Sequence, residues 1–225
     1  MAQPADRARL QAALGHAFRN TALLDEALTH ASSGGRDNQR LEFLGDALLN
    51  AAAAALIHRL RPDWEEGAMS KLRNLLVRTE TLAEWASDLG VELKQSMGKT
   101  KARMGAKPMA DALEALLGAV YLDGGKEGFA AVAALVESRF RRSIREAHEG
   151  LWAQADPKTT LQERAASLGL PKPVYTLLSQ DGPDHAPRFR VQVAVGLKTS
   201  EAEGGSRKGA EVEAARHLLE QLKDA

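Results

Sequence analysis

Residues 40–49 read RLEFLGDALL and place two acidic side chains inside an apolar helical pattern. Glu42 and Asp46 are four residues apart, so on a helix they lie on the same face. Like charges at this spacing destabilise a helix slightly, and acidic groups beside a hydrophobic core need a partner cation or a metal. The pair is therefore a candidate site as well as a helix face.

A second acidic pair stands further along the chain, where Asp111 and Glu114 are three residues apart and share a helix face. Hard divalent cations prefer oxygen ligands, and Mg²⁺ is commonly held by a few carboxylates together with water. Two helices with two carboxylates each can hold one or two such ions, which would activate water and stabilise a phosphoryl transition state. Spacing does not say that the helices meet, and such pairs are also common on solvated helix faces. Both interpretations stay open from the residues alone.

Around these motifs, residues 1–148 have the pattern of a helical domain. Ala, Leu and Glu dominate, apolar residues recur every three or four positions, and no long alternating run occurs. Gly and Pro residues interrupt the pattern and separate one helix from the next. We expect helices near residues 6–14, 21–31, 39–60, 68–89, 108–122 and 126–147.

From residue 156 onward the pattern changes. Asp156 and Pro157 predict a helix start, with Asp as the N-cap and Pro at the first helical position, and this helix should end at Gly169. Strand-like runs follow, and a last helix begins after Ser206. The expected strands cover residues 174–179, 188–195 and 197–201, and the expected last helix ends at residue 222.

Composition narrows the class of protein. The chain has 225 residues, enough for two domains, and its 30 Lys and Arg balance 30 Asp and Glu. A neutral chain lacks the usual basic footprint of nucleic-acid binding, so any such site must depend on local charge. Cysteine is absent, which excludes disulfides and Cys-ligated zinc and fits a reducing cytoplasm. The apolar run at 47–57 is short of the ~20 residues of a membrane span, so we expect a cytoplasmic protein without a membrane partner.

Together these motifs resemble the ribonuclease III family. RLEFLGDALL is similar to the family signature, and KPMADALEALLGAVYLDGG at 107–125 resembles its second acidic motif. EGAMS at 66–70 resembles the segment between them, and the order and separations also match. The resemblance covers essentially the whole chain and implies an all-α ribonuclease III endonuclease domain over residues 1–150.

The resemblance implies a role for each matching acid. Glu42, Asp111 and Glu114 match positions that hold Mg²⁺, for which Mn²⁺ can substitute. Asp46 matches the acid that is paired with Glu114 in catalysis. Glu66 matches an accessory acid that completes the active centre.

Two further positions near the first motif carry expectations from the family. Phe43 matches an aromatic side chain that inserts into the partner subunit of a homodimer, although without the resemblance it would be taken for an ordinary core residue. Gln39 stands where the family usually has Glu, so the carbonyl oxygen is kept and the charge is lost. Metal affinity or RNA handling is therefore expected to differ from that of typical members.

The start of the last helix is unusual for its charge. Arg207 and Lys208 follow the N-cap Ser206, where cations oppose the helix macrodipole. An anion bound at this end would explain the arrangement, since free backbone N–H groups and two cations together suit a phosphate. The alternative is a small tolerated penalty, because exposed charges are screened.

Residues 156–225 resemble a double-stranded RNA-binding domain with the order α-β-β-β-α. Such modules contact A-form RNA over ~16 bp through a first-helix face, a loop and a basic helix N-terminus, mainly by shape. Ala166 and Ala202 replace a Gln and a Gly that are usual in the family, which implies a lower affinity. The residues that match RNA contacts are Gln162, Glu163, His185, Arg207 and Lys208.

The resemblance implies an endonuclease that hydrolyses double-stranded RNA as a homodimer, each nuclease domain cutting one strand. It implies 5′-phosphate and 3′-hydroxyl ends with short 3′ overhangs, and a role in the processing of ribosomal RNA and other transcripts. One alternative is a non-catalytic double-stranded RNA-binding protein, which loss of a central carboxylate would favour; none is lost. The other is a helical metal-dependent hydrolase of nucleotides, against which the C-terminal module argues.

Overall fold

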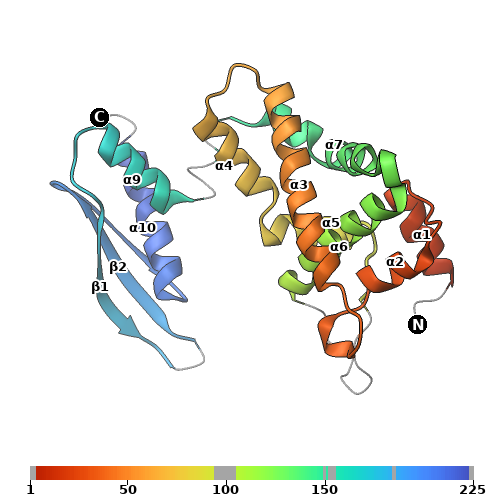
Figure 1. The fold of residues 1–225 in the computed structure, drawn as a ribbon. Helices are drawn as coiled ribbons and strands as arrows, with labels where there is room; N and C mark the ends of the chain where they lie inside the picture. Colours follow the sequence, from red (N-terminus) through yellow and green to blue (C-terminus); the bar gives the residue numbers. More distant parts are fainter. Residues whose placement is uncertain (1–3, 94–104, 149–150, 152–155, 184–185, 223–225) are drawn as a thin grey trace. The chain divides into compact units, whose positions relative to one another are not determined.

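This computed structural model describes residues 4–93, 105–148, 151, 156–183 and 186–222 of the chain. The chain divides into two compact units, Met1–Ala147 and His148–Ala225. Figure 1 shows that the first unit is built from helices and that the second joins a small sheet to two helices.

The first unit is a helical domain organised around two long helices, α3 and α6, which pack against each other (Figure 1). Most of α6 is buried, with Leu113, Leu116 and Leu117 fully inaccessible to solvent. The other helices cover this pair, and α7 also packs on α3 and α6. The helices are α1 (Pro4–Leu14), α2 (Thr21–Ala27), α3 (Gln39–Leu60), α4 (Glu66–Leu76), α5 (Thr79–Asp88), α6 (Ala106–Gly124) and α7 (Gly128–Glu146), with short 3-10 turns at Ala31–Ser33 and Gly125–Glu127.

Two glycines allow α3 and α6 to touch through their backbones. A Cβ atom placed on Gly45 would lie 1.7 Å from the carbonyl oxygen of Glu114, and one on Gly118 would lie 2.4 Å from that of Leu41. Real Cβ atoms do not approach backbone oxygen this closely, so only glycine fits at either position. The contact therefore determines which faces of the two helices meet.

Two expected helices differ from the structure. The expected helix over residues 21–31 ends at Ala27, and Ala31–Ser33 form a 3-10 turn. The predicted helix over residues 68–89 is two helices, α4 and α5, which are separated at Val77 and Arg78. Arg78 has an extended backbone with ψ of 153° and forms the N-cap of α5. The Oγ1 atom of Thr81 donates a 3.1 Å hydrogen bond to the carbonyl oxygen of Leu75, which takes up a free acceptor at the end of α4. Apolar spacing continues through this break, so the periodicity did not reveal it.

The second unit confirms the predicted order α-β-β-β-α. Its three strands form one antiparallel sheet in the order β1-β2-β3. Both helices pack on one face of this sheet around a core that includes Leu161, Val193, Val195 and Leu218 (Figure 1). The elements are α9 (Pro157–Ser167), β1 (Val174–Asp181), β2 (Arg188–Val195), β3 (Lys198–Gly204) and α10 (Arg207–Gln221).

Helix α3 also has a composition that bears on membrane association. Over the described residues, it is the one helix whose length and apolar character would suffice to cross a bilayer. It is also the central helix of the first unit, in contact with α6 and α7. Core helices of helical domains meet the same criteria, so this helix is weak evidence for a membrane span.

Candidate functional site

The two acidic pairs meet. Glu42 comes from α3, and Asp111 and Glu114 come from α6; one carboxylate oxygen from each lies within 4.8 Å of the other two. The glycine contact explains this, because Gly45 touches the backbone of Glu114 itself. The question that spacing left open is thereby answered for these three acids.

Asp46 lies one turn after Glu42 on α3 and is exposed. Its Oδ1 atom accepts a 3.0 Å hydrogen bond from Nδ2 of Asn50, which steadies the carboxylate. The negative charge of Asp46 contributes to raising the pKa of both Glu114 and Glu42, so the four acids share one electrostatic environment. Asp46 therefore acts electrostatically on the cluster without being one of the three acids that meet.

The carboxylates of this site repel one another, and this repulsion shifts their pKa values. Burial, and then the neighbouring carboxylates, raises the pKa of Glu114 to about 7. Burial and the charge of Asp111 also raise the pKa of Glu42. A set of crowded carboxylate oxygens is the donor set that hard divalent cations prefer, and a bound cation would relieve the repulsion. Glu42, Asp111 and Glu114 thus fit a divalent metal ion.

One cation from the chain itself stands beside these acids. The Nζ atom of Lys107, in the first turn of α6, lies 2.5 Å from Oδ1 of Asp111 and 3.7 Å from Oε1 of Glu42. The hydrogen bond to Asp111 raises the pKa of Lys107 above its usual value, so the ammonium group is charged at neutral pH. Lys107 was identified in the sequence as the first residue of the second acidic motif but was not connected with the acids.

Two other expected residues lie outside this cluster. Glu66 begins α4, and its Oε1 atom accepts a 2.6 Å hydrogen bond from Oγ of Ser70. It lines a cavity of ≈ 300 Å³ with residues of the later turns of α3, including Ala54 and His58. Gln39 is exposed at the first position of α3, one turn before Glu42. The structure therefore does not bring Glu66 together with the three clustered acids.

Phe43 lies next to the acidic site on the outside of the unit. Its side chain is 80% exposed, the largest exposure of an aromatic residue in the described chain. The interpretation as an ordinary core residue is therefore wrong for the single chain. An exposed aromatic ring of this kind is typical of an interaction site.

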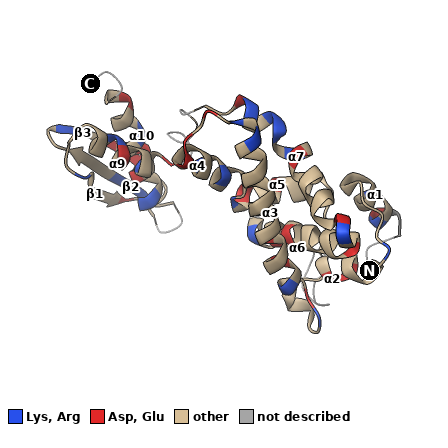
Figure 2. Cartoon of the chain, turned by 45° about the horizontal axis from the view of Figure 1, so that its top comes forward, with Lys and Arg blue, Asp and Glu red and all other residues tan. Residues whose placement is uncertain are grey.

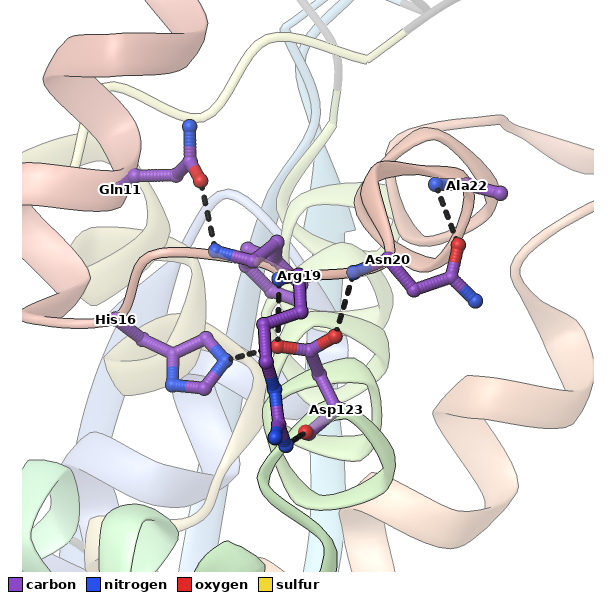
Figure 3. Close-up of polar contacts among 7 residues, drawn as sticks. Gln11, His16, Arg19, Asn20, Ala22 and Asp123 are labelled. Atoms are coloured by element: carbon purple, nitrogen blue, oxygen red, sulfur yellow. Dashed lines mark hydrogen bonds and ion pairs between the residues drawn. The ribbon is translucent and has the colours of Figure 1, made fainter.

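A buried polar network that the sequence did not reveal surrounds Asp123 at the end of α6 (Figure 3). Its Oδ1 atom accepts a 2.8 Å hydrogen bond from the backbone N–H of Asn20, and Oδ2 accepts one of 3.0 Å from that of Arg19. Nε2 of His16 lies 2.9 Å from Oδ2. Burial alone would raise the pKa of Asp123, but these hydrogen bonds outweigh it and hold the pKa below its usual range. The network anchors the segment after α1 to α6, which is a structural role.

In the second unit the expected RNA-binding residues lie on the surface. Gln162 and Glu163 are exposed on α9. Arg207 and Lys208 are exposed in the first turn of α10, where Oγ of the N-cap Ser206 accepts a 3.1 Å hydrogen bond from Gly209. His185 lies outside the described residues.

The cations at the start of α10 are partly neutralised by an acid. Glu211 accepts a 2.5 Å hydrogen bond from Nζ of Lys158 and one of 3.1 Å from Nε of Arg207. The contact with Lys158, and then that with Arg207, holds the pKa of Glu211 below its usual range. Lys158 also lies 4.5 Å from the centre of the Tyr175 ring, a cation–π contact. Sequence reasoning missed both Lys158 and Glu211, because their contact joins helices 53 residues apart.

Comparisons with known families match both units. The model of the family described as Ribonuclease-III-like matches residues 20–142, and that of the double-stranded RNA binding motif matches residues 157–222. Among curated proteins, Ribonuclease 3 of Azorhizobium caulinodans is 44% identical, over 97% of this chain and 95% of that protein. Ribonuclease 3 of Alkalilimnicola ehrlichii is 41% identical, over 98% of both chains.

Solved structures also resemble the first unit. The nuclease domain of ribonuclease III from Campylobacter jejuni, at 2.2 Å resolution, matches with a TM-score of 0.57 and 28% identity over 66% of this chain and all of that chain. A second structure of that domain describes flexibility in a region involved in dimer formation. It matches with a TM-score of 0.54 and 32% identity over 59% of this chain and 97% of that one.

Proposed function

The chain belongs to the ribonuclease III family, and from this premise we propose that it cleaves double-stranded RNA with Mg²⁺ held by Glu42, Asp111 and Glu114. A ribonuclease III domain and a double-stranded RNA-binding motif in one chain make it a double-stranded RNA endoribonuclease. The observation that carries the metal assignment is the meeting of three carboxylates from two helices within 4.8 Å. Mn²⁺ would be held by the same oxygen atoms.

The acids have distinct roles in this proposal. A bound divalent cation supplies Lewis acidity and lowers the pKa of water at the site. Glu42 and Asp111 bind the cation, while Glu114 both binds it and acts with Asp46 in catalysis. Because burial and the neighbouring acids raise the pKa of Glu114 to about 7 without a cation, metal binding would favour the ionised form of this group.

The remaining residues extend this proposal around the active site. Phe43, which is 80% exposed, inserts into a second copy of the chain to form a homodimer, as dimer formation is described for the Campylobacter jejuni nuclease domain. Glu66 acts as an accessory acid from its own cavity beside α3, away from the three clustered acids. The RNA-binding residues are Gln162, Glu163, His185, Arg207 and Lys208, in a domain that we place at residues 156–225 after a nuclease domain at 1–150.

The products and the biological setting follow from the family resemblance. We expect 5′-phosphate and 3′-hydroxyl ends with short 3′ overhangs. We also expect the enzyme to act in the cytoplasm on ribosomal RNA precursors and other transcripts. End-labelling of the products and sequencing of their termini would test the end chemistry directly.

Glu114→Gln is the decisive test, since it removes a ligand charge and hardly changes shape. Labelled duplex RNA is incubated with wild type and variant, with and without Mg²⁺, and binding is measured in parallel. We expect the variant to lose cleavage and to keep duplex binding. Glu127→Gln, at an exposed acid beyond the far end of α6, is the matched control and should cleave normally.

Two outcomes would contradict the proposal. Cleavage by Glu114→Gln near the wild-type rate at low Mg²⁺ would remove Glu114 from the metal site. Wild-type protein that binds duplex RNA but never cuts it with Mg²⁺ would favour the alternative of a non-catalytic RNA-binding protein.

A further inference from the structure

Lys107 occupies a position for which the proposed reaction gives no role. It lies four residues before Asp111 on α6, so its side chain reaches the same face as the acids. Its Nζ atom contacts Oδ1 of Asp111 at 2.5 Å and approaches Oε1 of Glu42 at 3.7 Å. These two acids are members of the three-carboxylate cluster. An ammonium group therefore bridges two of the oxygen donors that a metal ion would use.

The charge of Lys107 does part of what a metal ion would do. It acts to lower the pKa of Glu42 and of Glu114, against the raising effects of burial and the other acids. Three ionised carboxylates carry three negative charges, so one ammonium leaves two uncompensated. The cluster is thus stabilised without a metal but still attracts a divalent cation.

The side chain of Lys107 is also free to leave. It is 69% exposed, so the ammonium regains water when it moves away from the acids. Exposed ion pairs contribute little to stability, because solvent screens them and the long side chain loses conformational freedom. A divalent ion carries twice the charge and would displace the ammonium from the shared oxygen atoms.

We propose that Lys107 is an internal counter-cation that competes with the divalent metal ion for Asp111 and Glu42. It holds the acids together in the metal-free enzyme and lowers the metal affinity of the site. The inference rests on the proposed metal role of the three acids. In this proposal, Lys107 determines the concentration of metal ion at which the site becomes occupied.

Lys107→Gln in the full chain tests the competition, with Mn²⁺ alone as the probe and no RNA present. Binding is followed by calorimetry and by the loss of the free Mn²⁺ spin-resonance signal. Since two weak ion pairs are removed, we expect the variant to bind Mn²⁺ about three- to tenfold more tightly. Its melting temperature without metal should fall, and the rise on adding Mg²⁺ should be larger than in wild type.

Two matched variants make the result specific to this site. Lys107→Arg keeps the charge and should stay close to wild type in Mn²⁺ affinity. Lys126→Gln removes one exposed lysine beyond the other end of α6 and should leave the affinity unchanged. Equal or weaker Mn²⁺ binding by Lys107→Gln would overturn the inference, as would an equal gain in Lys126→Gln.

Failure of this inference can be told apart from failure of the metal assignment. If Glu114→Gln loses Mn²⁺ binding while Lys107→Gln equals wild type, the acids hold the metal and Lys107 does not compete. If Glu114→Gln binds Mn²⁺ as tightly as wild type, the metal assignment itself is wrong and the inference falls with it.

Discussion

The two units arrange charge in opposite ways. In the nuclease unit, three carboxylates cluster together, and a single ammonium group, that of Lys107, pairs with two of them. In the RNA-binding unit, two cations, Lys158 and Arg207, surround a single carboxylate, that of Glu211. Each cluster therefore has an excess of one sign and a residue of the other sign within it.

This difference shows how a chain with no net charge can bind both a metal ion and RNA. Figure 2 shows acidic and basic residues interspersed over both units, so binding depends on small local excesses. In each cluster the opposite charge keeps like charges in place before the ligand arrives. A ligand then has to displace or share that residue, which lowers affinity and preserves the geometry.

The largest effect is expected from separating the acids without changing any charge. In Gly45→Ala the new Cβ atom would lie 1.7 Å from the carbonyl oxygen of Glu114, so α3 and α6 must move apart. We expect a loss of roughly 3 kcal/mol or more in the free energy of unfolding, together with loss of cleavage and of Mn²⁺ binding. Urea unfolding and calorimetry measure the two effects.

Gly67→Ala is the control for this change. Gly67 lies in α4, and a Cβ atom placed on it would have nothing within 4 Å, so alanine should be neutral or stabilise the helix by up to ~1 kcal/mol. If Gly45→Ala retained normal stability and metal binding, the close approach would not be what assembles the acidic cluster.

A smaller effect is expected from a change that tests whether the nuclease unit forms a dimer through Phe43. Phe43 is 80% exposed beside Glu42, and truncation of a buried aromatic anchor in an interface usually costs a few kcal/mol. Phe43→Ala should therefore weaken the dimer by about 2–4 kcal/mol in sedimentation equilibrium. Phe129→Ala, at another exposed phenylalanine, should not. A wild-type monomer, or a variant dimer of unchanged strength, would remove Phe43 from the interface.

The smallest effect is expected in the RNA-binding unit, where contacts are spread over several groups. Arg207→Ala combined with Lys208→Ala should weaken binding to all duplex sequences alike, because phosphate contacts carry no sequence information. The slope of log K against log salt should flatten by up to about 2. Cleavage at saturating RNA should change little, since the acids are in the other unit.

Glu211→Gln tests the same comparison from the opposite side. It releases Lys158 and Arg207 from their shared carboxylate, so duplex binding should become tighter and more salt-dependent. An acid is thus needed for activity in one unit and restrains binding in the other.

If the variant with both Arg207→Ala and Lys208→Ala matched wild type across a salt titration, Arg207 and Lys208 would be ordinary surface charges. Normal binding with slow cleavage would give this unit a catalytic role.

Local signals predicted much of the fold. Asp156 and Ser206 form the expected N-caps of α9 and α10, because an N-cap depends on the residue and its immediate neighbours. The strand over residues 188–195 was also predicted, and its Val191, Val193 and Val195 are buried. The division between α4 and α5 was not, because the apolar period continues through the break at Val77 and Arg78.

The sequence identified the acidic residues of the candidate site, but not the helix packing that brings them together. Spacing placed Glu42 and Asp46 on one face, yet their meeting with α6 depends on Gly45, whose significance is visible only when the facing backbone is known. Lys107 was missed, because its approach to Glu42 depends on the packing of α6 against α3, which spacing does not show. Glu66 matched a motif in the chain but lies beside a different part of α3.

The hydrogen bonds to Asp123 can form only late in the synthesis of the nuclease unit. The three groups that contact the Asp123 carboxylate belong to residues 16–20. Asn20 precedes Asp123 by 103 residues. A ribosome that adds about 5–20 residues per second needs roughly 5 to 20 seconds to cover this distance. During that interval the segment between α1 and α2 lacks the carboxylate that later binds it. Its attachment to α6 therefore has to wait until most of the nuclease unit has been synthesised, although the segment itself is among the first parts to emerge.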